Sequence, residues 1–167
     1  IMAILAMRTY ALSMPLPDKI IGNDGKVIAT AEQIQHGQEL YQSRGLQQYG
    51  SVLGHGAYIG PDFTAEYLRL TTDAAVKQYR EEGKQEPREL VKNEWRKENK
   101  YDESSKTLNW TAGQTKGFDQ MVNHYRDTLT KDNTSQGLFP NAIKSEEELH
   151  DLVAFFGWTA WASAAER

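Results

Sequence analysis

Apolar positions recur at helical spacing in four stretches of the chain. In the last stretch, Leu149, Leu152, Val153 and Phe156 fall at i, i+3, i+4 and i+7, which places them on one face of a helix. Each stretch begins with a residue that can cap a helix, and in three cases Gln or Glu follows three positions later. The predicted helices run from Thr30, Thr64, Thr111 and Ser145 to about residues 45, 79, 129 and 156.

Two short segments predict β-hairpins, and the charged segment between the middle helices predicts a peripheral helix. Residues 20–28 surround an Asp-Gly turn, and residues 101–110 hold polar residues between apolar ends. From about residue 81 to 99 charges dominate, with Leu90, Val91 and Trp95 as sparse anchors. The fold class is therefore mainly α, with short β-hairpins and a charged helical insertion over about residues 81–110.

A glycine-rich loop separates the first two predicted helices. Residues 45–62 contain five glycines, at positions 45, 50, 54, 56 and 60. Glycine lets a backbone bend and approach another surface where a side chain would intrude. The sequence therefore predicts that this loop approaches a neighbouring surface closely, with Gly54, His55 and Gly56 at its centre.

Both ends of the chain are apolar. Residues 1–7 precede Arg8 and Tyr10, which is typical of the end of a transmembrane or membrane-proximal helix, here over residues 1–14. Residues 155–161 are apolar nearly all round a helix, so they are either buried or lie against a partner or a membrane. Of these we expect packing on the membrane side or on the helices of a larger parent protein. The remaining chain, residues 15–167, is predicted to form one domain.

Composition excludes several functions. The chain has no cysteine, which excludes disulfides, covalent c-type haem, thiolate metal sites and thiol nucleophiles. Its net charge of −4 gives no electrostatic case for binding nucleic acid. Lysines and arginines cluster only between Lys84 and Lys106, interleaved with acids, which indicates a solvated helix face.

The titratable residues form no catalytic pattern. His36, His124 and His150 lie on predicted helices without a second histidine at i+4, so their spacing supplies no converging metal ligands. Asp62 and Glu66 stand where a helix begins, and carboxylates there stabilise the helix dipole. We therefore assign no catalytic residue.

Two long motifs resemble a single family of membrane enzymes. The runs Gly54-His-Gly-Ala-Tyr-Ile-Gly-Pro-Asp-Phe-Thr-Ala-Glu-Tyr67 and Phe155-Phe-Gly-Trp-Thr-Ala-Trp-Ala162 closely resemble the quinol-dependent nitric oxide reductases. The resemblance extends from Arg8 to Trp161. It covers the extracytoplasmic domain between the first and second transmembrane helices of that single-chain enzyme, and it implies a cytochrome c-like helical fold.

The same segments are similar to the cytochrome c subunit of the two-subunit nitric oxide reductases. In that family a Cys-x-x-Cys-His motif precedes the glycine loop, and its positions fall here on Leu46, Tyr49 and Gly50. The axial methionine of that family falls on Phe139, directly before Pro140. The resemblance thus implies a domain without haem, in which large side chains fill the vacated volume because an empty cavity is costly.

The resemblance also implies a function for the whole enzyme. Such an enzyme reduces two nitric oxide molecules to nitrous oxide with electrons from a membrane quinol, at a haem and a non-haem iron inside its membrane helices. It would carry b-type haems, non-haem iron and, as in the cytochrome-bearing relatives, calcium. For that calcium, Tyr58 would supply a backbone carbonyl, a ligand type that calcium favours.

This segment would then be a structural cap without a cofactor of its own, anchored to the membrane on its extracytoplasmic side. Its partners would be the transmembrane helices of the same polypeptide, the membrane and the quinol site, with Gly54, His55 and Gly56 reaching towards the membrane part. A stand-alone binding or sensor module derived from a cytochrome is the alternative.

Overall fold

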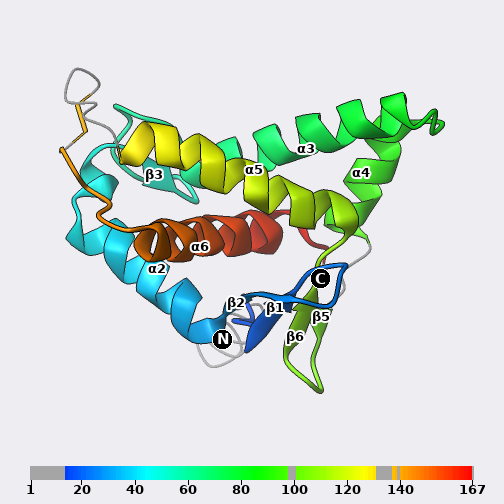
Figure 1. The fold of residues 1–167 in the computed structure, drawn as a ribbon, viewed down its shortest axis with the longest axis horizontal. Helices are drawn as coiled ribbons and strands as arrows, with labels where there is room; N and C mark the ends of the chain where they lie inside the picture. Colours follow the sequence, from blue (N-terminus) through cyan, green and yellow to red (C-terminus); the bar gives the residue numbers. More distant parts are fainter. Residues whose placement is uncertain (1–13, 98–100, 131–136, 139, 167) are drawn as a thin grey trace, which may run out of the picture.

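The computed structural model describes residues 14–97, 101–130, 137–138 and 140–166 (Figure 1). The predicted helix over residues 1–14 lies outside this part of the chain except for Met14, and Phe139 also lies outside it. None of the described helices is long and apolar enough to cross a membrane. Helices dominate the described residues, with a few short strands, and this confirms the mainly α fold class.

Four of the described helices confirm those that the apolar periodicity predicts, and the remaining one comes from the charged insertion. The helices pack in a bundle, and the short strands lie beside it (Figure 1). Their bounds are α2 (Ala31–Ser43), α3 (Phe63–Glu81), α4 (Pro87–Arg96), α5 (Ala112–Leu129) and α6 (Glu146–Ala164).

The helix starts follow the predicted capping residues with one exception. α2 and α5 begin with complete capping boxes, in which Thr30 and Thr111 exchange hydrogen bonds with the Gln three residues later. Ser145 caps α6, and its hydroxyl accepts the Glu148 N–H at 3.1 Å. The prediction that Thr64 caps α3 is wrong, because the Asp62 carboxylate takes that position and starts the helix two residues earlier.

α6 is the central helix of the domain. α2, α3 and α5 all pack against it (Figure 1). Phe155, Phe156 and Trp161 are buried among these helices and their neighbours. The expectation that residues 155–161 pack on the membrane side or on a partner is therefore wrong. The segment is apolar nearly all round because other parts of the same chain surround it.

α2 and α6 cross closely at a glycine. A Cβ atom at Gly37 would lie 2.0 Å from the carbonyl oxygen of Asp151, so no other residue fits there without moving a backbone. Such contacts make a helix crossing sensitive to a single methyl group. The crossing fixes the position of the glycine loop, because that loop starts where α2 ends.

Both predicted hairpins form, and they join into one sheet. β1 (Lys19–Ile21) pairs antiparallel with β2 (Val27–Thr30), and β5 (Tyr101–Asp102) pairs antiparallel with β6 (Thr107–Asn109). β1 and β6 then pair in parallel, which gives the order β2-β1-β6-β5. The sequence predicts each hairpin but not their union, because the residues that pair are far apart in the chain.

The charged insertion contains α4, which is shorter than predicted. α3 continues to Glu81, and α4 begins only at Pro87, where proline suits the first turn of a helix. Its anchors Val91 and Trp95 are buried, whereas Leu90 is 39% exposed. α4 packs mainly on α3, at one end of the domain (Figure 1).

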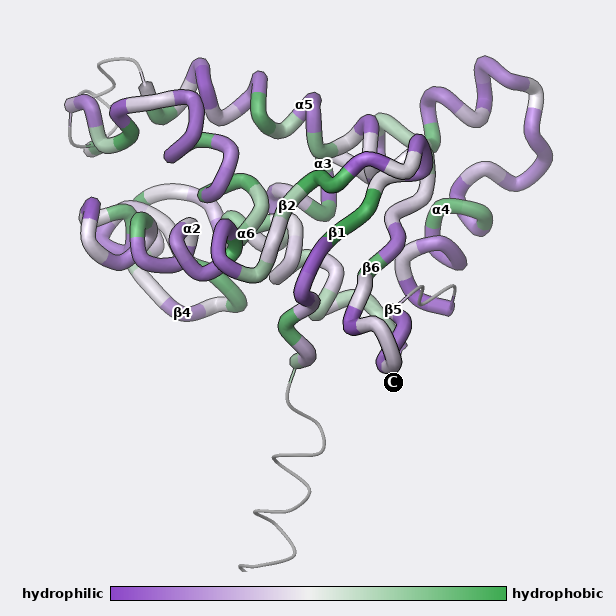
Figure 2. The backbone as a smooth tube through the Cα atoms, turned by 60° about the horizontal axis from the view of Figure 1, so that its bottom comes forward, coloured by the Kyte–Doolittle hydropathy of each residue, from purple (hydrophilic) through white to green (hydrophobic). Residues whose placement is uncertain are grey.

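The two ends of the described chain lie along one edge of the domain. In Figure 2 this is the lower edge, with the strand β4 (His55–Gly56) on the same side and α5 along the opposite edge. The Trp158 indole N–H donates to the Pro15 carbonyl at 3.0 Å, and the Glu166 N–H donates to the Arg96 carbonyl at 2.9 Å. These two bonds tie the ends to α6 and α4.

Candidate functional site: the glycine loop

The glycine loop, residues 45–62, has a packed base and an exposed tip. It contains a single 3-10 turn, η1 (Leu46–Gln48), and the two-residue strands β3 (Ser51–Val52) and β4. β3 and β4 pair antiparallel, so the chain turns back on itself at Leu53–Gly54. The base lies against α2 and the start of α3.

Two glycines in the base have no space for a side chain. A Cβ at Gly50 would lie 2.4 Å from the carbonyl oxygen of Pro61. At Gly56, φ is +138°, and a Cβ would lie 2.6 Å from the carbonyl oxygen of Gly50. At these two positions the loop packs closely against itself, whereas a Cβ at Gly54 would meet nothing within 4 Å. The close approach of Gly54, His55 and Gly56 to a neighbouring surface stays a prediction.

One hydroxyl and one carboxylate hold the base together. The Tyr41 hydroxyl, from α2, lies 3.1 Å from the carbonyl oxygen of Gly50 and 3.2 Å from that of His55. The Asp62 carboxylate accepts the Ser51 hydroxyl at 2.8 Å and the Gly54 N–H at 2.7 Å. The loop is thus pinned to the helix before it and to the helix after it.

The environment of Asp62 keeps its carboxylate ionised. Partial burial alone would raise the pKa of this group. Hydrogen bonds from the Ala65 N–H, the Ser51 hydroxyl and further backbone N–H groups outweigh that effect, so the pKa of Asp62 lies below its ordinary value. Asp62 therefore acts as a helix cap and loop clamp, which agrees with the prediction that it stabilises the start of a helix.

Thr64 does not cap α3, and its hydroxyl instead holds the glycine loop in place. Its hydroxyl accepts the Leu53 N–H at 3.1 Å and lies 3.0 Å from the Thr159 hydroxyl of α6. The Thr159 hydroxyl in turn donates to the Phe156 carbonyl. A chain of hydrogen bonds thus connects the turn of the loop to the central helix.

Large side chains occupy the region where the resemblance would put the haem-attachment residues. Leu46 is 1% exposed and Tyr49 is 9% exposed, while Gly50 has no room for an imidazole. Phe63 lies at the centre of an aromatic cluster, because its ring contacts four of the other rings. The cluster consists of Tyr41, Tyr49, Phe63, Tyr125, Phe155 and Phe156.

Phe63 is the residue that sequence reasoning missed. Its ring stacks on Phe156 with centroids 4.5 Å apart and an interplanar angle of 4°, and it is completely buried. Stacked and edge-on rings of this kind contribute about 1 kcal/mol per pair beyond their area. The signal was available, since Phe63 lies inside the longer of the two motifs and follows directly on the Asp62 cap.

The tip of the loop exposes apolar side chains. Tyr58 is 86% exposed, Ile59 is 72% exposed and Leu53 is 38% exposed. The His55 side chain is also exposed, and its carbonyl faces Tyr41. Neighbouring exposed apolar residues of this size are typical of an interaction surface.

To a calcium ion, the glycine loop offers backbone carbonyl oxygens as ligands. The carboxylate at the base of the loop, Asp62, is already engaged by three donors. No group of three or more His, Asp or Glu side chains that could hold a metal occurs among the described residues. Calcium ligation by the Tyr58 carbonyl therefore stays a prediction, and it requires most ligands to come from outside this chain.

The histidines take part in structural contacts on two helix pairs. Asp151 is buried between α2 and α6, where its carboxylate accepts the Gln33 amide at 3.0 Å and lies 2.8 Å from His36 Nδ1. The hydrogen bond to this carboxylate raises the pKa of His36. Between α3 and α5, His124 Nε2 lies 3.7 Å from the Glu66 carboxylate, which also accepts the Tyr125 hydroxyl at 2.9 Å. Neither arrangement brings a nucleophile and a base together.

Fold and loop together define a mainly α, cytochrome c-like domain that has no residue able to attach haem covalently. The chain belongs to the family of NorB cytochrome c-like domains of nitric oxide reductases, whose model it matches over residues 17–167. No curated protein matches the chain. The family match covers both motifs, the glycine loop and the charged insertion, so the chain is related to nitric oxide reductases along nearly its whole length.

Proposed function

We propose that this chain is the extracytoplasmic domain of a membrane-anchored, quinol-dependent nitric oxide reductase. In this role it is a structural cap over the catalytic membrane part, which carries b-type haems and non-haem iron. The domain itself transfers no electrons. The observation that carries the proposal is the exposed apolar tip of the glycine loop on a domain of the nitric oxide reductase family.

The tip supports docking on the membrane part of the same polypeptide. Tyr58 and Ile59 are the two most exposed large apolar side chains of the described chain. The base beneath them is held by hydrogen bonds of Asp62 and Tyr41 to Gly54 and His55. A preorganised apolar surface binds with a smaller loss of conformational entropy than a flexible one.

The composition of the core supports electron entry from within the membrane. The chain has no cysteine, and rings from several helices fill the interior beside the glycine loop. A quinol dissolved in the bilayer delivers electrons to the membrane helices directly. An external haem domain would then be unnecessary, and the fold would be retained for its shape.

The positions of the chain ends support insertion between two membrane helices. A domain placed between such helices needs both of its ends on the membrane side. Both ends of the described chain lie along one edge, with β4 on the same side (Figure 2). In the proposed arrangement this edge faces the membrane, and α5 faces away from it.

The proposal is tested on the native polypeptide that carries this segment, extracted from membranes in detergent. We expect an intact mass far above the 18.9 kDa of this chain and b-type haem bands that shift when nitric oxide is added. The preparation should convert nitric oxide to nitrous oxide with a quinol as the donor. A species near 18.9 kDa without visible absorbance would instead support the stand-alone module.

A paired variant tests the docking role of the tip. Replacing Tyr58 and Ile59 by Ser should lower the yield or the activity of the assembled enzyme, because the apolar contact is lost. Val27→Ser is the matched control, since Val27 is 54% exposed on β2, away from the loop. Equal behaviour of the two variants would contradict docking through the tip.

A further inference from the structure

A groove of about 620 Å³ lies between α3 and α4, at the far end of α3 from the glycine loop. Its volume is within the range of about 300–1,000 Å³ that is usual for small-molecule sites. The last turn of α6 closes one end of the groove. Its floor is apolar and consists of Leu68, Val76, Val91, Trp95 and Ala164.

Basic side chains from both helices surround this floor. The groove is lined by five basic residues and one acidic residue, although the chain as a whole has a net charge of −4. The acidic residue, Asp73, lies 3.8 Å from Arg69 in a surface ion pair. The basic residues are Lys77 and Arg80 from α3 and Arg88, Lys92 and Arg96 from α4.

Most of this positive charge is available for an external anion. Within the described part of the chain, Lys92 is the one of the five that forms an ion pair, with Glu89 at 3.3 Å. That pair is on the surface, where ion pairs contribute little and exchange readily. The five side chains are themselves exposed around the groove.

An apolar floor beneath a basic rim fits an anionic amphiphile. Basic groups bind phosphate oxygens, and the floor shields an alkyl chain from water. A folded protein partner would need a much larger contact, at least about 1,200 Å² in total for a stable complex. Free phosphate would use the rim alone and leave the floor without a ligand.

The position of the groove points to a source for this ligand. Arg96, Ser163 and Ala164 line the groove, and the Arg96 carbonyl accepts the Glu166 N–H at the end of the described chain. Under the proposed function this edge faces the bilayer. The Arg96 end of the groove would therefore lie nearest to phospholipid headgroups.

We propose that the groove between α3 and α4 binds an anionic phospholipid of the surrounding bilayer. The headgroup phosphate lies against Arg80, Arg88 and Arg96, and an acyl chain lies along the floor next to Trp95. The bound lipid ties the charged insertion to the membrane surface. This inference rests on the proposed function, because it requires the membrane to be adjacent.

The test uses the full polypeptide, purified in detergent, stripped of lipid and titrated with phosphatidylglycerol. Native mass spectrometry counts the lipid molecules that stay bound. The variant R80Q/R88Q/R96Q should bind one phosphatidylglycerol fewer at low lipid concentration. Each basic residue near an anionic lipid surface contributes roughly fivefold, so the concentration that fills this site should rise about a hundredfold.

A charge-matched control separates the groove from general electrostatic attraction. K26Q/K116Q/K144Q removes three exposed charges from other elements and should bind phosphatidylglycerol like the wild type. Phosphatidylcholine should not fill the site in any of the proteins. Equal lipid counts for wild type and the arginine variant, or equal filling by phosphatidylcholine, would overturn the proposal.

Two further measurements distinguish an acyl chain from a bare anion. Ala164→Trp narrows the apolar floor without changing charge, and it should also remove the bound lipid. Inorganic phosphate at millimolar concentration should leave the lipid in place, and displacement by phosphate alone would refute the lipid assignment. If the preparation consumes nitric oxide but the arginine variant binds as many lipid molecules as the wild type, only this inference fails. If it has no haem and no activity, the proposed function fails.

Discussion

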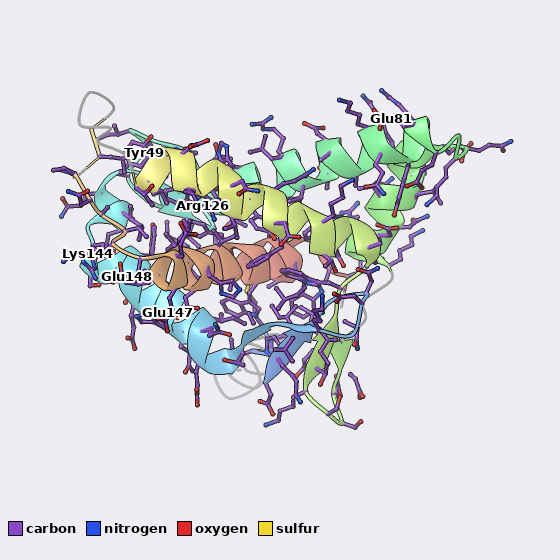
Figure 3. The ribbon with its side chains drawn as sticks, in the orientation of Figure 1. Tyr49, Glu81, Arg126, Lys144, Glu147 and Glu148 are labelled. Carbon is purple, nitrogen blue, oxygen red and sulfur yellow. The ribbon has the colours of Figure 1, made fainter. Side chains whose placement is uncertain are left out.

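The two ends of α3 are built from different kinds of residue. At the start of the helix, glycines and one carboxylate bring backbone segments of the glycine loop together. At its other end, basic side chains of α3 and α4 surround an open, apolar groove. Figure 3 shows how far apart these regions are, with Tyr49 at one end of the domain and Glu81 at the other.

The comparison shows that the two regions depend on different properties of the chain. The loop depends on backbone shape, because positions 50 and 56 accept nothing larger than glycine. The groove depends on charge placement, because its exposed side chains can be exchanged without repacking a core. A substitution in the loop base should therefore damage folding, whereas one at the groove rim should change binding alone.

The largest expected effect is that of Gly56→Val. The substitution puts a branched side chain at φ +138° and against the Gly50 carbonyl. Backbone strain and overpacking should together lower the free energy of unfolding by about 4 kcal/mol. Urea unfolding of this chain measures the change, and Lys97→Ala, at an exposed site, should stay within about 0.5 kcal/mol. Equal, negligible effects would contradict the close approach within the loop.

The next largest expected effect is the difference in stability loss between alanine substitutions at two tyrosines of the glycine loop. Tyr49→Ala removes a buried ring that packs on Phe63 and should cost about 3 kcal/mol. Tyr58→Ala removes an exposed ring and should change stability by less than about 0.5 kcal/mol. The two unfolding curves measured side by side test the division into base and tip. Similar losses would show that the tip is part of the core.

Trp95→Ala should release α4 without unfolding the bundle. The indole is one of two buried anchors of a ten-residue helix, and a helix of that length is marginal by itself. Hydrogen exchange should become fast across α4 and stay slow in α6, a local loss of roughly 2 kcal/mol. Leu90→Ala, at a partly exposed position, is the control. Lost protection in α6 as well would mean that α4 belongs to the main folding unit.

The smallest effect is the pH dependence that Asp62 contributes. Because its folded pKa is lowered, the stabilisation is present above the unfolded pKa of about 3.9 and is lost as pH falls through the folded value. Asp62→Asn retains a capping side chain and should cost about 1 kcal/mol at pH 7. Unfolding at several pH values should show this difference shrinking below pH 4. A constant difference would rule out the carboxylate charge as its cause.

The helices could be predicted because their signals are local. The capping residues Thr30 and Thr111 stand within one turn of the helices they start. The parallel pairing of β1 with β6 could not be predicted, since it joins residues separated by most of the chain. The apolar segment 155–161 was misplaced for a related reason. A sequence shows that a helix is apolar all round, but not which neighbours cover it.

The glycine loop and the groove also differ in whether the sequence alone reveals them. The glycine loop can be recognised in the sequence, because five glycines within residues 45–62 need a steric explanation. The groove cannot, because Lys77 and Arg80 precede the charged run and meet Arg88 and Arg96 only after α4 folds back on α3. The prediction of a simple solvated helix face missed this convergence.

The docked tip of the glycine loop is tested most directly by cysteine labelling. The chain has no cysteine, so Tyr58→Cys and Gln120→Cys each introduce a unique thiol, provided that cysteines elsewhere in the polypeptide are replaced. In this chain alone, both thiols should react with a water-soluble maleimide at similar rates. In the intact polypeptide, the thiol at position 58 should be protected at least tenfold, while the thiol at position 120 on α5 stays reactive. Equal labelling of both positions in the intact polypeptide would contradict the docked cap.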